Sequence, residues 1–215
     1  MLINSQLGEI YLFLGGDMNR VLFIGFIISV FCVLLLIQVG CTQEVKNKTL
    51  TNEEMVALGK YIVSTSGCDD CHTPKIFTER GPIFDTTRSL SGYPGGEIPS
   101  LDVNMIGPEK WIATDKHLGM WVGPWGVSYS ANLTPDTATG IGVVTEEMFL
   151  KTFKEGKLKG MMRPLLPPMP WQVYGMKTDQ DIKAIYAYLR TIKPIHNVVP
   201  QPVPPDKLEG FFAGK

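Results

Sequence analysis

The chain has 215 residues, of which 44% are hydrophobic and 19% charged, and its formal net charge is -1. This length suggests one folded domain with additional segments, and the balanced charge excludes the strongly basic character of a typical nucleic-acid binder. The 22 glycines and 16 prolines are more than a compact helical protein needs, so long stretches of irregular backbone are expected.

The first recognisable segment is apolar: residues 21–43 contain no charged side chain and directly follow Arg20. A basic residue before an apolar stretch is typical of an export signal, so residues 18–40 are predicted to be a signal peptide or a membrane anchor. The acidic side chains within residues 1–17 do not suit such a signal. We therefore interpret that part as an extension from a mis-assigned upstream start codon.

Cys41 ends the sequence Ile-Gln-Val-Gly-Cys, which resembles the lipobox of bacterial lipoproteins, although Gln38 replaces the usual aliphatic residue. The resemblance implies cleavage before Cys41 and acylation of its side chain. An uncleaved helix that spans the bilayer and a plain secretory signal remain open alternatives. In all three cases the rest of the chain lies outside the cytoplasm, and residues 41–50 form a polar tether.

A capping box opens the first predicted helix of the domain, because Thr51 is followed three residues later by Glu54. The helix is expected to run to about Ser64. Gly59 inside it suits a close crossing by another helix, since glycine otherwise weakens a helix. The apolar side chains expected on one face are Met55, Leu58, Tyr61 and Ile62.

The next sequence is Gly-Cys-Asp-Asp-Cys-His, and this CxxCH pattern is the attachment site of a c-type haem. Cys68 and Cys71 can each form a thioether to one vinyl group, and His72 is then expected to bind the iron through an imidazole nitrogen. The alternatives are a thiol redox pair or half of a zinc site, but the sequence has no second CxxC to complete a zinc site.

Residues 73–144 have no helical period and are predicted to be an irregular insertion that wraps around the haem. Trp111, Trp121 and Trp125 are expected to bury against the porphyrin edge or against one another. The alternative for residues 121–129 is a surface that binds a partner.

Two further helices have clear ends. One starts after Thr145 and stops at Gly156, with Met148, Phe149 and Phe153 facing inward. The other is capped by Thr178, covers residues 179–192 and is ended by Pro194. Its buried stripe has helical spacing and consists of Ile182, Ile185, Tyr186 and Leu189.

Met169 is the predicted second axial ligand of the iron and lies in Leu-Leu-Pro-Pro-Met-Pro-Trp. The prolines bias the backbone toward extended conformations, so the loop can hold a sulfur atom near the iron without becoming a helix. A thioether is soft and neutral and favours ferrous iron. The alternatives that remain are Met161, Met162, His117 and His196.

One cluster of basic residues is either a docking patch for a redox partner or a solvated helix face. Its members are Lys151, Lys154, Lys157, Lys159 and Arg163. The chain ends in a proline-rich arm, residues 199–215, whose first part is expected to be extended along the domain surface.

A capped helix leading into CxxCH and a final helix with a Tyr/Leu stripe resemble the frame of class I cytochromes c. In that family the first and last helices cross, which implies that Gly59 and Tyr61 meet Tyr186 and Leu189. Residues 55–195 also resemble the haem modules in the cytochrome c subunits of membrane-bound alcohol and sugar dehydrogenases. The matching segments are Cys-His-Thr-Pro, Asn-Leu-Thr-Pro-Asp, Thr-Gly-Ile-Gly, Pro-x-Met-Pro-aromatic and Ala-Tyr-Leu-Arg. Those subunits commonly contain three CxxCH sites, and this chain contains one.

The resemblance implies an all-α cytochrome c fold in residues 51–198, with the irregular insertion 73–144 between the CxxCH helix and the third helix. It implies one covalent haem c with His72 and Met169 as axial ligands, and electron transfer without catalysis. Partners would be a dehydrogenase, a quinol-oxidising complex or a terminal oxidase, on the periplasmic side of a bacterial membrane. A haem gas sensor or a small peroxidase with an open iron site is the alternative function.

Overall fold

The computed structural model describes residues 20–32, 49–98, 100–158 and 162–213. The chain divides into two units, residues 1–49 and 50–215, which we describe separately. In the first unit residues 20–32 are helical. No helix within the described ranges combines the length and apolar character needed to cross a bilayer. Cys41 lies outside these ranges, so its acylation stays a prediction.

In the second unit the first helix, α2 (Asn52–Thr65), begins with the capping box that the sequence predicted. The backbone N–H of Glu54 donates to the Thr51 hydroxyl at 3.2 Å, and the Glu54 carboxylate accepts the Thr51 N–H at 2.9 Å. These two bonds satisfy backbone donors that would otherwise be unpaired at the helix start.

The last long helix, α6 (Asp179–Leu189), has the same kind of cap at Thr178 and crosses α2 at Gly59. A Cβ atom at Gly59 would lie 1.9 Å from the Ala184 carbonyl oxygen and 2.8 Å from the Tyr188 Cβ. The crossing at Gly59 is therefore confirmed, but α6 presents Ala184 and Tyr188 there.

Two details of the expected crossing are wrong. Tyr61 is 67% exposed and takes no part in the core, because its place on α2 faces solvent. Tyr186 instead packs against Phe149 of α4, with 5.4 Å between the ring centres, whereas Leu189 shares a hydrophobic cluster with Ile62 and Val63 of α2. The helix also ends at Leu189, with Arg190 as its C-cap, three residues before the predicted end at 192.

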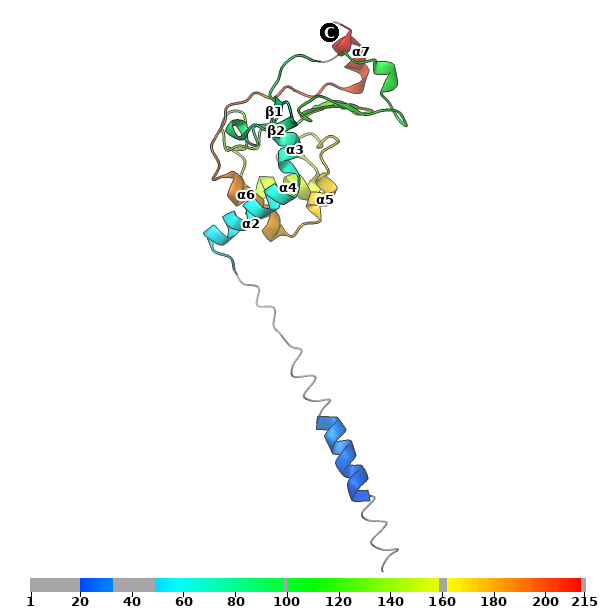
Figure 1. Cartoon of the computed structure of the whole chain (residues 1–215), viewed down its shortest axis with the longest axis vertical. Helices are drawn as coiled ribbons and strands as arrows, with labels where there is room; N and C mark the ends of the chain where they lie inside the picture. The colour runs from blue at the N-terminus through cyan, green and yellow to red at the C-terminus, as the bar shows by residue number, and fades with distance from the viewer. Residues whose placement is uncertain (1–19, 33–48, 99, 159–161, 214–215) are drawn as a thin grey trace, which may run out of the picture. The chain divides into compact units, whose positions relative to one another are not determined.

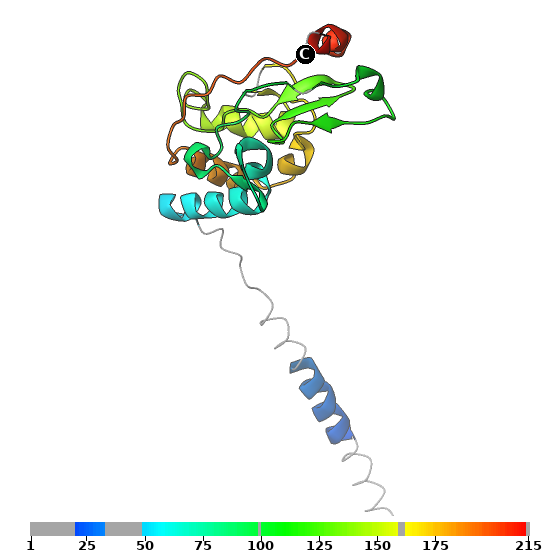
Figure 2. The same cartoon turned by 45° about the horizontal axis from the view of Figure 1, so that its top comes forward.

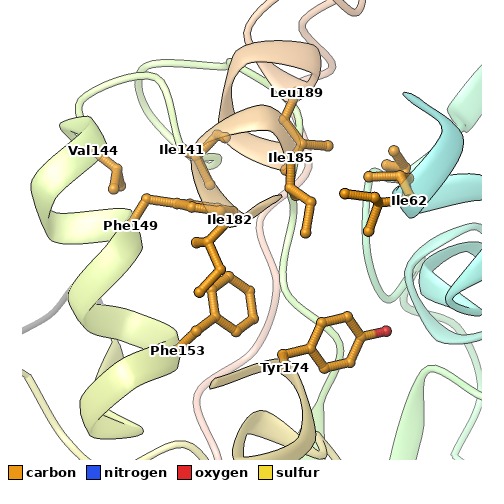
Figure 3. Packing of buried hydrophobic residues seen from close by; sticks show 11 residues of the cluster. Ile62, Ile141, Val144, Phe149, Phe153, Tyr174, Ile182, Ile185 and Leu189 are labelled. Atoms are coloured by element: carbon orange, nitrogen blue, oxygen red, sulfur yellow. The ribbon is translucent and has the colours of Figure 1, made fainter. Parts of the chain in front are cut away.

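The remaining helices are α3 (Cys68–His72), α4 (Glu146–Glu155) and α5 (Trp171–Gly175). As predicted, the Thr145 hydroxyl caps α4, and Gly156 ends it with a φ of 66°. Helices α2, α4, α5 and α6 enclose one hydrophobic cluster, part of which Figure 3 shows. The buried residues of this cluster are Ile62, Val63, Leu90, Ile141, Val144, Phe149, Phe153, Tyr174, Ile182, Ile185 and Leu189.

The middle segment contains strands, so the expectations of an all-α domain and an irregular insertion do not describe residues 75–129. A hairpin pairs β1 (Lys75–Thr78) with β2 (Gly81–Phe84). A three-stranded sheet follows, in the order β3 (Ala113–Thr114), β4 (Met120–Gly123) and β5 (Gly126–Tyr129). Single 3-10 turns lie at η1 (Thr86–Arg88) and η2 (Val103–Met105).

The C-terminal arm packs on this sheet. Val203 pairs with Val127 of β5, and the short η4 (Pro205–Lys207) and α7 (Leu208–Phe212) follow. Figures 1 and 2 both show α7 and the green strands together, at the end of the unit opposite α2. A second hydrophobic cluster fills the space between them: Tyr93, Ile106, Met120, Val122, Val127, Leu208 and Phe212.

Candidate functional site

The short helix α3 carries the three residues of the CxxCH pattern. It starts at Gly67, whose φ of 72° is in the left-handed region that favours glycine. Cys68 and Cys71 are three residues apart and therefore lie on neighbouring positions of the helix surface. Both thiols are free and half-buried, and burial raises the pKa of each. Two unpaired thiols one turn apart fit the two vinyl groups of a haem.

His72 is oriented through its Nδ1 atom, which lies 2.7 Å from the Ala131 carbonyl oxygen. A carbonyl can only accept, so Nδ1 carries the proton and Nε2 keeps its lone pair. Burial lowers the pKa of the imidazole, which favours the neutral form that binds metals. Within the described part of the chain, Nε2 has no hydrogen-bond partner. This arrangement fits an imidazole that binds iron through Nε2.

A polar network holds the segment that begins at Ala131. The Asn132 side chain donates to the Ile195 carbonyl at 2.8 Å, and its oxygen accepts from Thr134. The Asn197 amide donates to the Ser91 carbonyl at 2.7 Å and to that of Tyr93 at 2.9 Å. The sequence analysis matched Asn-Leu-Thr-Pro-Asp and Thr-Gly-Ile-Gly of this loop to segments of the family. The Asn132 contacts hold the loop directly after Ala131, whose carbonyl orients His72.

Tyr174 is a site residue that the sequence reasoning missed. Its hydroxyl donates to the Ser66 carbonyl at 2.6 Å and lies 3.7 Å from the Cys68 sulfur. Figure 3 shows the ring beside Phe153 with its oxygen pointing away from that residue. Burial raises the pKa of this phenol, so it stays protonated. The signal available in the sequence was an aromatic residue shortly after Met169, but α5 is too short to show a helical period.

Lys75 is a second missed residue, with only 8% of its surface exposed. Its ammonium donates to the carbonyl oxygens of Thr73 at 2.8 Å and Asp69 at 3.3 Å, and also to that of Asp70. These carbonyls belong to α3 and to its C-cap. The Thr73 hydroxyl in turn donates to the Asp69 carboxylate at 2.5 Å. The end of the CxxCH helix is thus held by buried polar side chains.

Met169 lies in a loop that is fixed at both ends and in the middle. Before Met169, the Leu165 N–H donates to the Gly156 carbonyl at 2.7 Å. The Ser128 hydroxyl donates to the Pro167 carbonyl at 2.6 Å. After it, the Trp171 N–H donates to the Met169 carbonyl at 2.9 Å. Met169 is half-buried and packs against the same hydrophobic cluster as Cys68. The fold therefore brings these two segments to one core.

The other candidate axial ligands have less suitable surroundings. Met162 is 56% exposed, and Met161 lies outside the described residues. His117 accepts the Lys75 backbone N–H through Nδ1 at 3.0 Å. His196 is an exposed side chain whose Nδ1 lies 3.7 Å from the Asp136 carboxylate.

The basic cluster is largely paired with neighbouring carboxylates. Lys151 lies 2.9 Å from Glu147, Lys154 lies 3.1 Å from Asp179, and Lys157 lies 3.8 Å from Glu155. Lys159 is outside the described residues. These pairs favour the interpretation as a solvated helix face over that of a docking patch.

Across the described ranges, no group of three or more His, Cys, Asp and Glu side chains could hold a metal ion.

Comparison with known proteins finds similar sequences among cytochrome subunits of dehydrogenases. The chain is 41% identical over 73 residues to the fructose dehydrogenase cytochrome subunit of Gluconobacter japonicus, which is 34% of this chain and 15% of that protein. It is 30% identical over 150 residues to the gluconate 2-dehydrogenase cytochrome c subunit of Pantoea cypripedii, or 69% of this chain and 24% of the relative. The third relative is the cytochrome c subunit of the quinone-dependent alcohol dehydrogenase of Gluconobacter oxydans (strain 621H). The chain is 29% identical to it over 148 residues, which cover 67% of this chain and 23% of that relative.

These matches confirm the resemblance that the sequence motifs indicated. The chain is similar to a c-type cytochrome module of dehydrogenase cytochrome subunits, and the similarity implies a cytochrome-like fold. It spans at most 24% of the length of these three relatives. No family model matches the chain.

Proposed function

We propose that this chain is an electron-transfer protein that holds one c-type haem through Cys68 and Cys71, with His72 and Met169 as axial ligands. The observation that supports this most directly is the imidazole of His72. It is oriented by the Ala131 carbonyl at 2.7 Å, next to two free thiols on the same short helix. The haem supplies the one-electron couple, and the chain supplies the ligands and the apolar surroundings that set its potential.

Two protein side chains on the iron leave no position for a substrate, which is why we propose a carrier without catalytic residues. The names of the relatives agree, since each is the cytochrome subunit of a dehydrogenase. The partners we propose are therefore a dehydrogenase that delivers electrons, or a quinol-oxidising complex or terminal oxidase.

We place the protein on the periplasmic side of a bacterial membrane, because covalent haem attachment suits a protein that has been exported. The tether we favour is an acyl group on Cys41, with an uncleaved N-terminal helix as the second possibility. The mass of the purified mature protein tests both, because cleavage before Cys41 with an added lipid gives a mass different from that of the full chain. A Cys41→Ser variant that still enters the membrane contradicts the lipid anchor.

Covalent haem attachment is tested by producing the full chain in cells that mature c-type cytochromes. We expect a haem stain that survives a denaturing gel and a mass increase of one haem, both lost in the Cys68→Ser/Cys71→Ser double variant. Cys32→Ser is the matched control and keeps the haem, because this cysteine lies outside the CxxCH helix. A colourless wild-type chain overturns the proposal.

The role of Met169 is tested by carbon monoxide binding to the reduced protein. The wild-type chain should bind it slowly, because the thioether must first leave the iron, whereas Met169→Ala should bind it at once. Met162→Ala is the matched control, since this methionine is 56% exposed and should leave the rate unchanged. Rapid binding by the wild-type protein contradicts Met169 ligation and favours the gas sensor or peroxidase.

A further inference from the structure

Lys75 presents a buried positive charge at the end of the CxxCH helix. Its ammonium contacts three backbone carbonyl oxygens, those of Asp69, Asp70 and Thr73, and lies 5.2 Å from the centre of the Phe84 ring. Among the described side chains no carboxylate forms an ion pair with it. Burial lowers the pKa of this ammonium, and the carboxylates of Asp70, Asp115 and Asp69 favour its charge without forming an ion pair. A buried charge is costly, so this lysine needs an explanation beyond surface solubility.

The carbonyl contacts explain how the charge is held. The last carbonyl groups of a helix have no partner within the helix and carry partial negative charge. The three donors of an ammonium group can contact three such oxygens at once, and of those here the Asp69 oxygen also accepts the Thr73 N–H at 3.1 Å. Lys75 thereby ties the segment from Asp69 to Thr73 into a fixed shape, and this segment contains Cys71 and His72.

The same charge acts on the haem attachment residues. The electrostatic effect of Lys75 on Cys71 favours the charged thiolate and opposes the effect of burial, which raises the pKa of that thiol. A buried charge is little screened by salt, so its field extends to groups attached at Cys71. Ferric iron carries one more positive charge than ferrous iron, and a nearby cation therefore disfavours the ferric state.

We propose that Lys75 is a positioning residue of the haem site whose ammonium holds the carbonyl end of α3 and whose charge favours ferrous over ferric iron. This inference rests on the proposed function, because it requires a haem attached at Cys68 and Cys71.

The test measures the ratio of ferrous to ferric iron in the purified full-length holoprotein, at a fixed ambient potential where the wild type is half reduced. Lys75→Met removes the charge and the donors, and Lys75→Gln keeps a donor without the charge. Both should lower the ratio by about threefold to tenfold. Lys110→Met is the matched control, because this exposed lysine also donates to a backbone carbonyl, that of Asn104 at 3.0 Å. Its ratio should change by less than about twofold.

A neutral variant with the wild-type ratio overturns the inference and leaves the proposed function intact. A wild-type chain without covalent haem overturns the proposed function itself. Lys75→Arg covers the case in which neither neutral variant accumulates with haem. If Lys75→Arg and Lys110→Met yield holoprotein while the two neutral Lys75 variants do not, a positive charge is needed at this position. If Lys75→Arg also fails to hold haem, the charge is not sufficient, and the inference is overturned because the site then requires the shape of the lysine side chain.

Discussion

The hydroxyl of Tyr174 joins two segments that are distant in the sequence and that both belong to the candidate haem site. It donates to the Ser66 carbonyl just before the CxxCH helix and contacts the sulfur of Cys68. The ring itself is buried beside Phe153, with 5.6 Å between the ring centres. A single side chain therefore fixes the entry to α3 against the main hydrophobic cluster.

Tyr174→Phe removes the hydroxyl and keeps the ring, so the packing with Phe153 stays and the Ser66 carbonyl loses its donor. We expect the free energy of unfolding to fall by about 1 kcal/mol, the cost of losing one hydrogen bond to a half-buried acceptor. Denaturant unfolding of the holoprotein measures this loss. Tyr61→Phe is the control, since Tyr61 is 67% exposed and should change stability by less than about 0.5 kcal/mol. Equal effects of the two changes would contradict a role for the Tyr174 hydroxyl.

At the scale of elements, the contact between α2 and α6 depends on the missing side chain of Gly59. A methyl group there would overlap the Ala184 carbonyl of the opposite helix. Gly59→Ala should therefore lower the free energy of unfolding by about 2–3 kcal/mol, as overpacking of a tight contact does. Thermal or denaturant unfolding measures the effect.

Gly210→Ala in α7 is the matched control for that substitution. A Cβ at Gly210 meets nothing within 4 Å, and alanine is the better helix former, so stability should rise by up to about 1 kcal/mol. The opposite signs separate crowding from helix propensity. An unchanged stability of Gly59→Ala would show that the two helices can move apart without cost.

The helices were predictable because their signals are local. Thr51, Thr145 and Thr178 cap the next turn by hydrogen bonds to residues three positions away, and Gly156 ends α4 with its own backbone conformation. The CxxCH residues were found in the same way. The strands were missed because each covers four residues or fewer and is defined by pairing with another segment.

The missed site residues have the same physical explanation. The Tyr174 hydroxyl acquires its role from contacts with Ser66 and Cys68, which lie more than 100 positions away in the sequence. The burial of Lys75 depends on the hairpin that begins with it, and nothing in its immediate neighbours indicates that a lysine is buried. Met169 was proposed from its proline-rich surroundings, whereas the bond that holds its loop comes from a strand that the sequence did not reveal.

At the scale of the whole domain, the two hydrophobic clusters are connected through Ser128. This serine lies on β5 of the sheet, accepts from the Trp125 ring N–H at 3.1 Å and donates to the Pro167 carbonyl at 2.6 Å. The sheet and the C-terminal arm are thereby linked to the loop that carries Met169. The three-stranded sheet can thus stabilise the loop of Met169, which packs against the helices.

Ser128→Ala should loosen the Met169 loop without removing the methionine. We expect carbon monoxide to bind the reduced protein about fivefold to tenfold faster than it binds the wild type, the factor that corresponds to one lost hydrogen bond. Ser130→Ala is the control, because the Ser130 hydroxyl is buried without a hydrogen-bond partner among the described residues and its removal should leave the rate unchanged. A wild-type rate in Ser128→Ala would mean that the sheet does not support the ligand loop.

The polar network around Asn132 also has a consequence for how the protein is made. The carbonyl that orients His72 is held by residues near Ile195 and Asn197, which the ribosome adds long after the two cysteines have emerged. Until those residues have been added, the Ala131 carbonyl lacks the contacts that hold its loop, so the His72 imidazole is not yet oriented. If the proposed function holds, a chain cut short before Ile195 would offer its two thiols for haem attachment with a His72 ring whose orienting loop lacks its partners.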